Sequence, residues 1–311
     1  MQRIYFDTTT NTYTIPDTQM EVEIIAASAH PSLSKANPIH TLRMRYPRII
    51  HAELMTHRVF SRNARSSRAV PVSRMIQEIK SDPFVPWHWG KNQKGMQASE
   101  ECDEPVFIGS EYNDDGWHRE HAWLSAANVA IRHAEAFMNA GYHKQIANRL
   151  LEPFMYIDVL VTSTEWENFL WLRDHKDAEP HLQDLATLVR RALEGPVEVL
   201  KPGVWHLPYI TEEERDMPVD LLRKISAARC ARISYAPFDG DASYERELKR
   251  YDTLVRSDRV HASPLEHQAV PDTWNPVTNS WKFPEMHGNL NGWIQYRKLV
   301  PNEAYTPEKD I

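Results

Sequence analysis

Eight arginines fall between Arg43 and Arg74, and a single acid, Glu53, stands among them. The arginines occupy positions 43, 45, 48, 58, 62, 65, 68 and 74. Eight positive charges and one negative charge give this stretch +7, within a chain whose formal net charge is −7. Planar guanidinium groups interleaved with hydroxyls bind phosphate well. The stretch therefore predicts a phosphate-binding segment, and the alternative is a solvated or ion-paired face of little energetic weight.

The centre of this stretch, from Thr56 to Arg68, reads THRVFSRNARSSR. Arg58, Arg62 and Arg65 recur at the spacing of a helix. Pro47, upstream of them, is a residue type that commonly stands at the start of a helix. We therefore expect a helix that begins after Pro47 and continues into the arginine motif.

Composition limits the class of protein. A chain of 311 residues can bury a large core without a metal or a disulfide. Two cysteines, Cys102 and Cys230, are typical of a reducing compartment, so a cytoplasmic protein is expected. No apolar run approaches the roughly 20 residues of a membrane span, and the acidic net charge argues against stable binding to nucleic acid. His118 and His121 lack a third ligand nearby, so no metal site is expected.

The apolar pattern predicts mixed α and β structure without a regular βαβ alternation. Strands are expected over residues 21–28, 39–46 and 154–162, and helices over 122–140, 167–173, 182–193 and 244–255. Thr164 and Glu167 match a capping box at the start of the second of these helices. Residues 99–115 are acidic and aperiodic, which predicts an exposed insertion.

The arginine motif resembles the signature of the flavin-dependent thymidylate synthases, RHRxxSxNExSxRY. The matching residues are His57, Arg58, Ser61, Asn63, Ser66 and Arg68. Thr56, Ala64 and Ala69 depart from the signature, at the positions where it has Arg, Glu and Tyr. We interpret the motif as a divergent form of that signature.

Further segments resemble elements of the same family. Residues 168–173 (NFLWLR) are similar to a helix that ends in a substrate-binding arginine. Residues 227–235 (AARCARISY) and 261–267 (HASPLEH) look like two elements that the family carries before its signature, whereas here they follow it. Residues 295–303 (QYRKLVPNE) resemble a second, degenerate signature. This order leads to the hypothesis of a fused or permuted chain whose two copies complement each other.

The resemblance implies an α/β fold of the α+β type, with a central, mostly antiparallel sheet and flanking helices, like that of thymidylate synthase complementing proteins and unlike a Rossmann fold. It divides the chain into residues 1–200 with the signature and the substrate helix, a linker over residues 201–219, and residues 220–311 with flavin-site elements and the degenerate signature. It also implies a homo-oligomer, which would be a tetramer, or a dimer if the two halves are pseudo-repeats.

The resemblance assigns roles to individual residues. Arg173 is expected to be catalytic, because it would stabilise negative charge on the pyrimidine as electron density moves toward C5. The residues expected to bind substrate are Ser66, Arg68, Arg149, Arg173 and Glu303. The residues expected to bind the flavin are His57, Arg58, Asn63, Asn168, Ser234, His261, Ser263, Glu266 and Arg297. Asn148 is the alternative to Arg149, because the alignment slips by one residue there.

The family transfers a methylene group from methylenetetrahydrofolate to C5 of deoxyuridylate, with FAD as cofactor and NADPH as reductant. Because the flavin carries the hard chemical step, the protein needs only to bind, orient and polarise. The resemblance therefore implies flavin-dependent methylation of a deoxypyrimidine monophosphate, most simply dUMP to dTMP. The alternatives are a methylase or hydroxymethylase that acts on dCMP or dUMP, and a non-enzymatic relative that binds nucleotides or nucleic acid.

Overall fold

The computed structural model describes residues 4–109, 116–233, 240–255 and 260–304. Its strands are β1 (Tyr5–Asp7), β2 (Thr12–Thr14), β3 (Glu21–Ala29), β4 (Ile39–Pro47), β5 (Ser61–Ala64), β6 (Tyr156–Ser163), β7 (Glu198–Val199), β8 (Ala269–Pro271), β9 (Trp274–Asn275), β10 (Ser280–Trp281) and β11 (Trp293–Gln295). Its α-helices are α1 (His51–Leu54), α2 (Val72–Ser81), α3 (Arg119–Asn139), α4 (Lys144–Ala147), α5 (Glu167–Arg173), α6 (Pro180–Leu193), α7 (Val219–Arg232) and α8 (Tyr244–Val255). Its 3-10 helices are η1 (Arg48–Ile50), η2 (Asn148–Phe154), η3 (Glu212–Glu214), η4 (Ser263–Glu266), η5 (Pro284–Met286) and η6 (Tyr296–Leu299).

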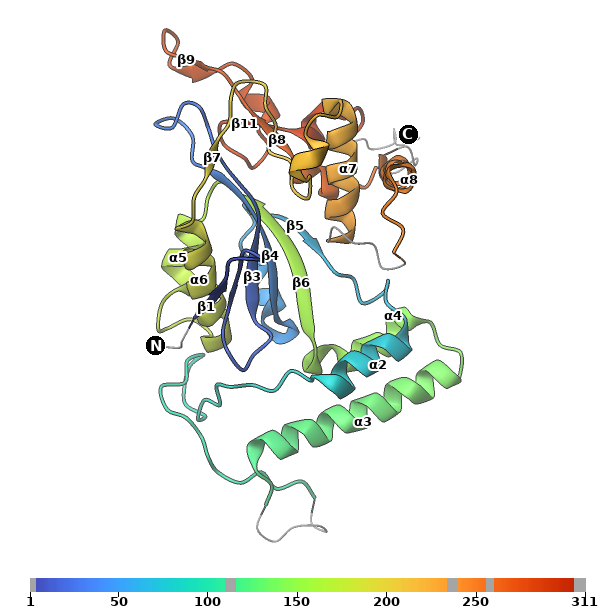
Figure 1. The fold of residues 1–311 in the computed structure, drawn as a ribbon. Coiled ribbons are helices and arrows are strands. Elements are labelled where there is room, and N and C mark those ends of the chain that lie inside the picture. The colour runs from blue at the N-terminus through green and yellow to red at the C-terminus, as the bar shows by residue number, and fades with distance from the viewer. Residues whose placement is uncertain (1–3, 110–115, 234–239, 256–259, 305–311) are drawn as a thin grey trace, which may run out of the picture.

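A central sheet with flanking helices organises the chain (Figure 1). Within the described residues, its strand order is β1-β2-β3-β4-β6-β5, and β7 pairs with β3 beyond the end of β2. All of these pairings are antiparallel except that of β3 with β7. The mixed α and β class with a mostly antiparallel sheet is therefore confirmed.

The three longest strands follow directly from the sequence pattern. The predicted strands over residues 21–28, 39–46 and 154–162 are confirmed as β3, β4 and β6. Apolar side chains such as Val22, Leu42 and Val159 occupy alternate positions, so all of them lie on one face of the sheet. On that face they pack against α5 and α6, which places the largest buried cluster between the sheet and these helices.

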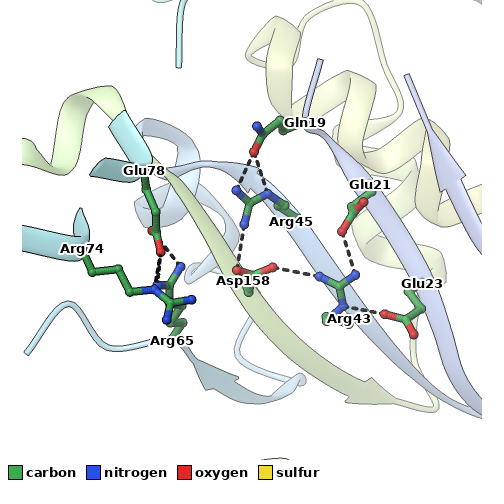
Figure 2. Close-up of polar contacts among 9 residues, drawn as sticks. All are labelled: Gln19, Glu21, Glu23, Arg43, Arg45, Arg65, Arg74, Glu78 and Asp158. Carbon is green, nitrogen blue, oxygen red and sulfur yellow. Dashed lines mark hydrogen bonds and ion pairs between the residues drawn. The ribbon is translucent and has the colours of Figure 1, made fainter. Parts of the chain in front are cut away.

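The intervening positions on the other face of the sheet are charged (Figure 2). Arg43 and Arg45 of β4 each donate to one carboxylate oxygen of Asp158 on β6, at 2.9 and 3.0 Å. Arg43 also pairs with Glu21 and Glu23 of β3, at 2.7 and 2.5 Å. The register of β4 against β3 and β6 thus places each arginine opposite an acid.

Farther along the same face, the C-terminal part of the chain covers the sheet. Leu160 of β6 packs with Cys230 and Ile233 at the end of α7, and with Tyr209. Residues 201–219, which the sequence marks as a linker, include Tyr209 and His206, both about 1% exposed. This segment therefore packs onto the sheet and its backbone bridges to Ala269 at the start of β8.

A chain of buried hydrogen bonds joins the sheet to the C-terminal part. His206 bonds Ser28 of β3 through Nδ1 and Thr41 of β4 through Nε2, both at 2.9 Å. The hydroxyl of Thr41 meets that of Thr162 on β6 at 2.6 Å, and Thr162 in turn bonds Nδ1 of His267 at 2.8 Å. These five residues are at most 5% exposed, and they connect three strands to the residue that follows η4.

Helices α2, α3 and α4 form a second cluster beside one end of the sheet. The predicted helix over residues 122–140 is confirmed as α3, which lies outside α2 and α4 in Figure 1. Ile131 and Ala134 of α3 are buried in a cluster with Met75 and Ile79 of α2. The helices predicted over 182–193 and 244–255 are confirmed as α6 and α8.

The prediction that a helix continues into the arginine motif is wrong. Helix α1 ends at Leu54, and residues 61–64 form the edge strand β5, paired with β6. The pairing with β6 satisfies the backbone groups of the motif, so its side chains alternate with a period of two. The predicted capping box is also wrong, because the buried hydroxyl of Thr164 has no hydrogen-bond partner within the described residues.

The exposed insertion is confirmed over residues 99–109, and residues 110–115 lie outside the described part of the chain. Arg119, at the start of α3, anchors this segment by donating to the carbonyl of Cys102 at 2.6 Å and to Asp103 at 2.5 Å. Across the described ranges, no helix combines the length and the apolar character that crossing a membrane requires.

We expect the free energy of unfolding to fall as the pH drops from 6.5 toward 4. Burial lowers the pKa of His40 to about 4 and the pKa of His206 and His267 to about 3. Between those values and the ordinary value of 6.5, the unfolded chain binds more protons, and each histidine contributes a loss of about 1.4 kcal/mol per pH unit. Urea unfolding at pH 5, 7 and 8.5 measures the effect.

His88 opposes this trend, because its bond to Asp184 raises its pKa. The histidines with a lowered pKa, which also include His51 and His57, outnumber it. The free energy of unfolding therefore still rises with pH below 6.5, and the contribution of these histidines to that rise vanishes between pH 7 and 8.5. Equal stability at pH 5 and pH 7 would show that these histidines are not buried in the neutral form.

Candidate functional site

Acids from other elements neutralise most of the arginine-rich stretch. Arg43 and Arg45 pair with Asp158, as described above. Arg48 lies 3.2 Å from Glu152 of η2. Glu78 of α2 receives Arg65 at 2.7 Å and Arg74 at 3.0 Å (Figure 2). Five of the eight arginines are therefore structural, as the plainer interpretation of the sequence anticipated.

Three arginines, all inside the signature-like motif, have no acid partner within the described residues. Arg62 donates to the backbone carbonyls of Met55 and His57, at 3.0 and 3.3 Å. Arg58 and Arg68 are exposed, and neither guanidinium bonds another group in the described part of the chain. An unpaired guanidinium keeps its donors available for a bidentate anion such as phosphate. Within the arginine-rich stretch, the guanidinium groups without an acid partner therefore all lie in the motif.

Strand β5 directs the motif toward the C-terminal part of the chain. Ser61 and Asn63 share one face of β5 because they are two residues apart. Asn63 donates to the carbonyl of Cys230 in α7 at 3.3 Å, and the hydroxyl of Ser61 contacts Asn289 at 3.2 Å. Strand β5 also packs against η4. The sequence pattern gave no sign of Asn289, which additionally donates to the carbonyl of Val59 at 2.7 Å.

Before β5, the motif meets the helix that ends in Arg173. Nε of Arg173 donates to Nε2 of His57 at 3.0 Å, and Nη2 donates to the hydroxyl of Thr56 at 3.2 Å. His57 is 7% exposed and its ring packs edge-on against Phe169 of α5. Burial, and then the charges of Arg173 and Arg62, lower the pKa of His57 to about 4. The imidazole is therefore neutral at pH 7 and accepts from Arg173.

After β5, the motif forms a loop that η2 supports. Asn148 is fully buried and donates to the carbonyls of Ser67 and Val70, at 2.7 and 2.9 Å. Its neighbour Arg149 is exposed, with no partner among the described residues. Asn148 thus supports the loop, and Arg149 remains the residue of the two that is available to an anion. Ser66 is exposed in the same loop and accepts from the backbone N–H of Arg68 at 3.3 Å.

The two ends of β5 therefore carry two groups of expected site residues. His57 and Arg173 lie at its start, and Ser66 and Arg68 lie just past its end. A strand of four residues spans about 10 Å, at about 3.3 Å per residue. The two groups therefore lie beyond opposite ends of this strand.

Three of the expected site residues of the C-terminal part bind one another. Arg297 pairs with Glu266, and its Nε donates to Glu303 at 2.6 Å. Lys298 also donates to Glu303, at 2.7 Å. His261, which precedes η4, and Ser263, the first residue of η4, are exposed. Asn168 is exposed on α5. Ser234 lies outside the described residues.

A profile of the thymidylate synthase complementing protein family matches residues 11–196. The chain belongs to this family. The matched region contains the arginine motif, η2 and the helix that ends in Arg173, so the resemblance seen in the motif is confirmed. The segments 227–235, 261–267 and 295–303 lie beyond the matched region.

No curated protein matches this family member. Among solved structures, it is similar to a UMP/dUMP methylase, PolB, from Streptomyces cacaoi bound with 5-Br UMP, at 20% identity and a TM-score of 0.41, over 57% of this chain and 89% of that one. It is also similar to the flavin dependent thymidylate synthase ThyX from Helicobacter pylori complexed with FAD and dUMP, at 18% identity and a TM-score of 0.32, over 50% of this chain and 67% of that one.

We expect Arg68→Ala to weaken binding of a nucleoside monophosphate by roughly tenfold or more, because it removes an unpaired fork donor. The free energy of unfolding should change by less than about 0.5 kcal/mol, since the side chain is exposed. Arg65→Ala is the matched control, because it removes the same charge from an arginine already held by Glu78. Titration calorimetry with dUMP at fixed ionic strength compares them, and equal losses in both variants would refute a specific role for Arg68.

Proposed function

We propose that the protein is a flavin-dependent enzyme that methylates a deoxypyrimidine monophosphate at C5, most simply dUMP to dTMP, with methylenetetrahydrofolate and NADPH as co-substrates. One observation carries this proposal. After acids neutralise the structural arginines, the guanidinium groups of Arg58 and Arg68 remain exposed and unpaired within the described residues, at signature positions of a thymidylate synthase complementing protein family member. Such groups suit the phosphates of a nucleotide substrate and a nucleotide cofactor.

The substrate phosphate would bind at the loop after β5. Ser66 supplies a hydroxyl, and Arg68 and Arg149 supply exposed guanidinium groups. Asn148 fixes the loop by donating two hydrogen bonds to backbone carbonyls of the loop. A loop held in this way binds an anion at a lower entropic cost than a free loop does.

Arg173 would face the pyrimidine. A charged guanidinium placed at the base stabilises the negative charge that develops on the ring as C5 becomes nucleophilic. The imidazole of His57 is uncharged, so it holds this guanidinium by a hydrogen bond and does not neutralise its positive charge. Glu303 is proposed as a further substrate-binding residue. Burial favours a higher pKa for this carboxyl, but the bonds from Lys298 and Arg297 lower it, so it is ionised at pH 7.

The residues present fit a bound FAD. Arg58, Asn168, His261 and Ser263 are exposed donors, and η4, which carries Ser263, packs against β5 of the motif. The flavin would be held indirectly by Asn63, Glu266 and Arg297. Each of these side chains already bonds another element and so fixes the position of the residues around it. When bound, the reduced flavin supplies the hydride that converts the transferred methylene group to methyl.

The cysteines do not offer an alternative route through a thiolate at α7. Cys230 is fully buried, and burial raises the pKa of its thiol well above the ordinary value. A thiol in such a setting is not a nucleophile at neutral pH. This supports a route in which the protein binds and polarises the substrate.

A homo-oligomer is also proposed. Trp171 and Leu172 on α5 are 76% and 42% exposed, next to Arg173. Large apolar side chains exposed beside a candidate site favour a covering partner, and a second copy of the chain is the simplest one. Acids neutralise five of the eight arginines in the arginine-rich stretch, which supports a mononucleotide ligand over nucleic acid.

The decisive experiment for this function combines flavin uptake with turnover. We expect the purified protein to acquire a stoichiometric visible flavin band on addition of FAD. With methylenetetrahydrofolate and NADPH, it should release tritium from deoxyuridylate labelled at C5. Labelled deoxycytidylate, tested in parallel, decides between the two bases. Failure to take up FAD together with no release from either nucleotide would refute the proposal.

We propose that residues 1–200 and 220–311 both contribute to one site across the packed segment 201–219, and Glu303→Gln tests this. The change removes the carboxylate charge that Arg297 and Lys298 hold. We expect turnover to fall by roughly tenfold or more with flavin uptake unchanged. Glu285→Gln, at an exposed position of η5, is the control. Full activity of Glu303→Gln would rule out a role for the second signature.

A further inference from the structure

We propose that His57 and Thr56 are positioning residues that hold Arg173 for the substrate, and that His57 does not bind the flavin phosphates. The inference rests on the proposed function for the identity of the substrate. Arg173 has two hydrogen-bond acceptors within the described residues, Nε2 of His57 at 3.0 Å and the hydroxyl of Thr56 at 3.2 Å. Both belong to the motif, whereas Arg173 ends α5.

The two bonds occupy one edge of the guanidinium. Nε–H and one N–H of Nη2 point in the same direction from one side of this planar group. His57 accepts the hydrogen bond from Nε–H, and Thr56 accepts the one from Nη2. Nη1 and the second N–H of Nη2 form the end of the group, which bonds nothing else in the described chain. The pair therefore fixes the orientation of Arg173 and leaves a two-donor end for an anion or a carbonyl.

The role of His57 as an acceptor requires a neutral ring. The groups that face it are Arg173 from α5 and Arg62 from β5, with Phe60 and Phe169 against its faces and edges. Two positive charges and aromatic packing oppose protonation. A neutral ring that accepts at Nε2 carries its proton on Nδ1. His57 is only 7% exposed and its ring is uncharged, so it offers a phosphate little accessible surface and no positive charge.

Thr56 explains a departure from the signature. The signature has arginine at this position, where a second guanidinium would stand beside that of Arg173. Threonine instead accepts from Nη2 of Arg173 while its hydroxyl donates to the carbonyl of Glu53 at 2.6 Å. Threonine at position 56, where the signature has arginine, therefore accepts one of the two bonds that hold Arg173. We call these two bonds, to His57 and Thr56, the clamp on Arg173.

The test is a set of variants measured for flavin uptake, nucleotide binding and turnover. His57→Leu removes the acceptor and keeps the apolar packing, whereas His57→Gln places a carbonyl oxygen where Nε2 lies. We expect His57→Leu to reduce kcat/KM roughly 10- to 100-fold, since a bond to a charged group is lost. His57→Gln should recover most of this activity, Thr56→Val should show a smaller loss, and all three should take up FAD like the native protein.

A double-mutant cycle separates positioning from general damage. In an Arg173→Ala background, His57→Leu should cause no further loss in kcat/KM, because the group it positions is gone. Additive losses would overturn the proposal. So would a fall in FAD affinity in His57→Leu with nucleotide binding unchanged, because that result would place His57 at the flavin.

A readout without turnover keeps this inference separable from the proposed function. Nitrogen NMR of histidine-labelled protein, with His57 assigned by its loss in His57→Gln, should show a neutral ring with its proton on Nδ1 from pH 5.5 to 8. Arg173→Ala should raise the pKa of His57 and release this preference. A ring protonated at pH 7, or one with its proton on Nε2, would refute the clamp even if the enzyme turns over dUMP.

Discussion

The bridging of two arginines by one carboxylate is the interaction on which the rest of the charge distribution depends. Asp158 binds both Arg43 and Arg45, which otherwise would stand side by side as like charges on β4. With these arginines and those held by Glu78 neutralised, the unpaired guanidinium groups of the described chain's arginine-rich stretch lie in the motif around β5. A sheet built on charged strands thus keeps its own positive charge from competing with the candidate anion site.

Local patterns in the sequence predicted the long elements because their burial is set by their own alternation. Residues 21–28 are rich in apolar side chains and residues 39–46 alternate apolar and polar ones, and both segments form strands of the central sheet. The arginine motif could not be predicted in the same way. Arg58, Arg62 and Arg65 satisfy a helical spacing, but the competing structure is an edge strand whose partner, β6, lies far along the chain. Pairing over such a distance leaves no trace in the motif itself.

The same distinction applies to the candidate site. Motif spacing singled out Ser66 and Arg68, which the structure leaves exposed. It gave no indication that Asn148 would support their loop from 81 residues away, or that Arg173 would meet His57 from 116 residues away. The expectation that His57 binds a flavin phosphate came from resemblance alone. Its burial between aromatic rings and two guanidinium groups indicates that its imidazole is uncharged.

The buried chain from Ser28 through His206, Thr41 and Thr162 to His267 has a consequence for how the protein folds. Each neutral imidazole carries one proton and each hydroxyl donates one hydrogen bond, so the direction of one bond in the chain restricts the directions of its neighbours. Such a row of groups is satisfied only when β3, β4, β6 and the residue after η4 are all in place. The N-terminal and C-terminal parts therefore stabilise each other. Partial unfolding of either part would leave buried polar groups of the other part without their hydrogen-bond partners.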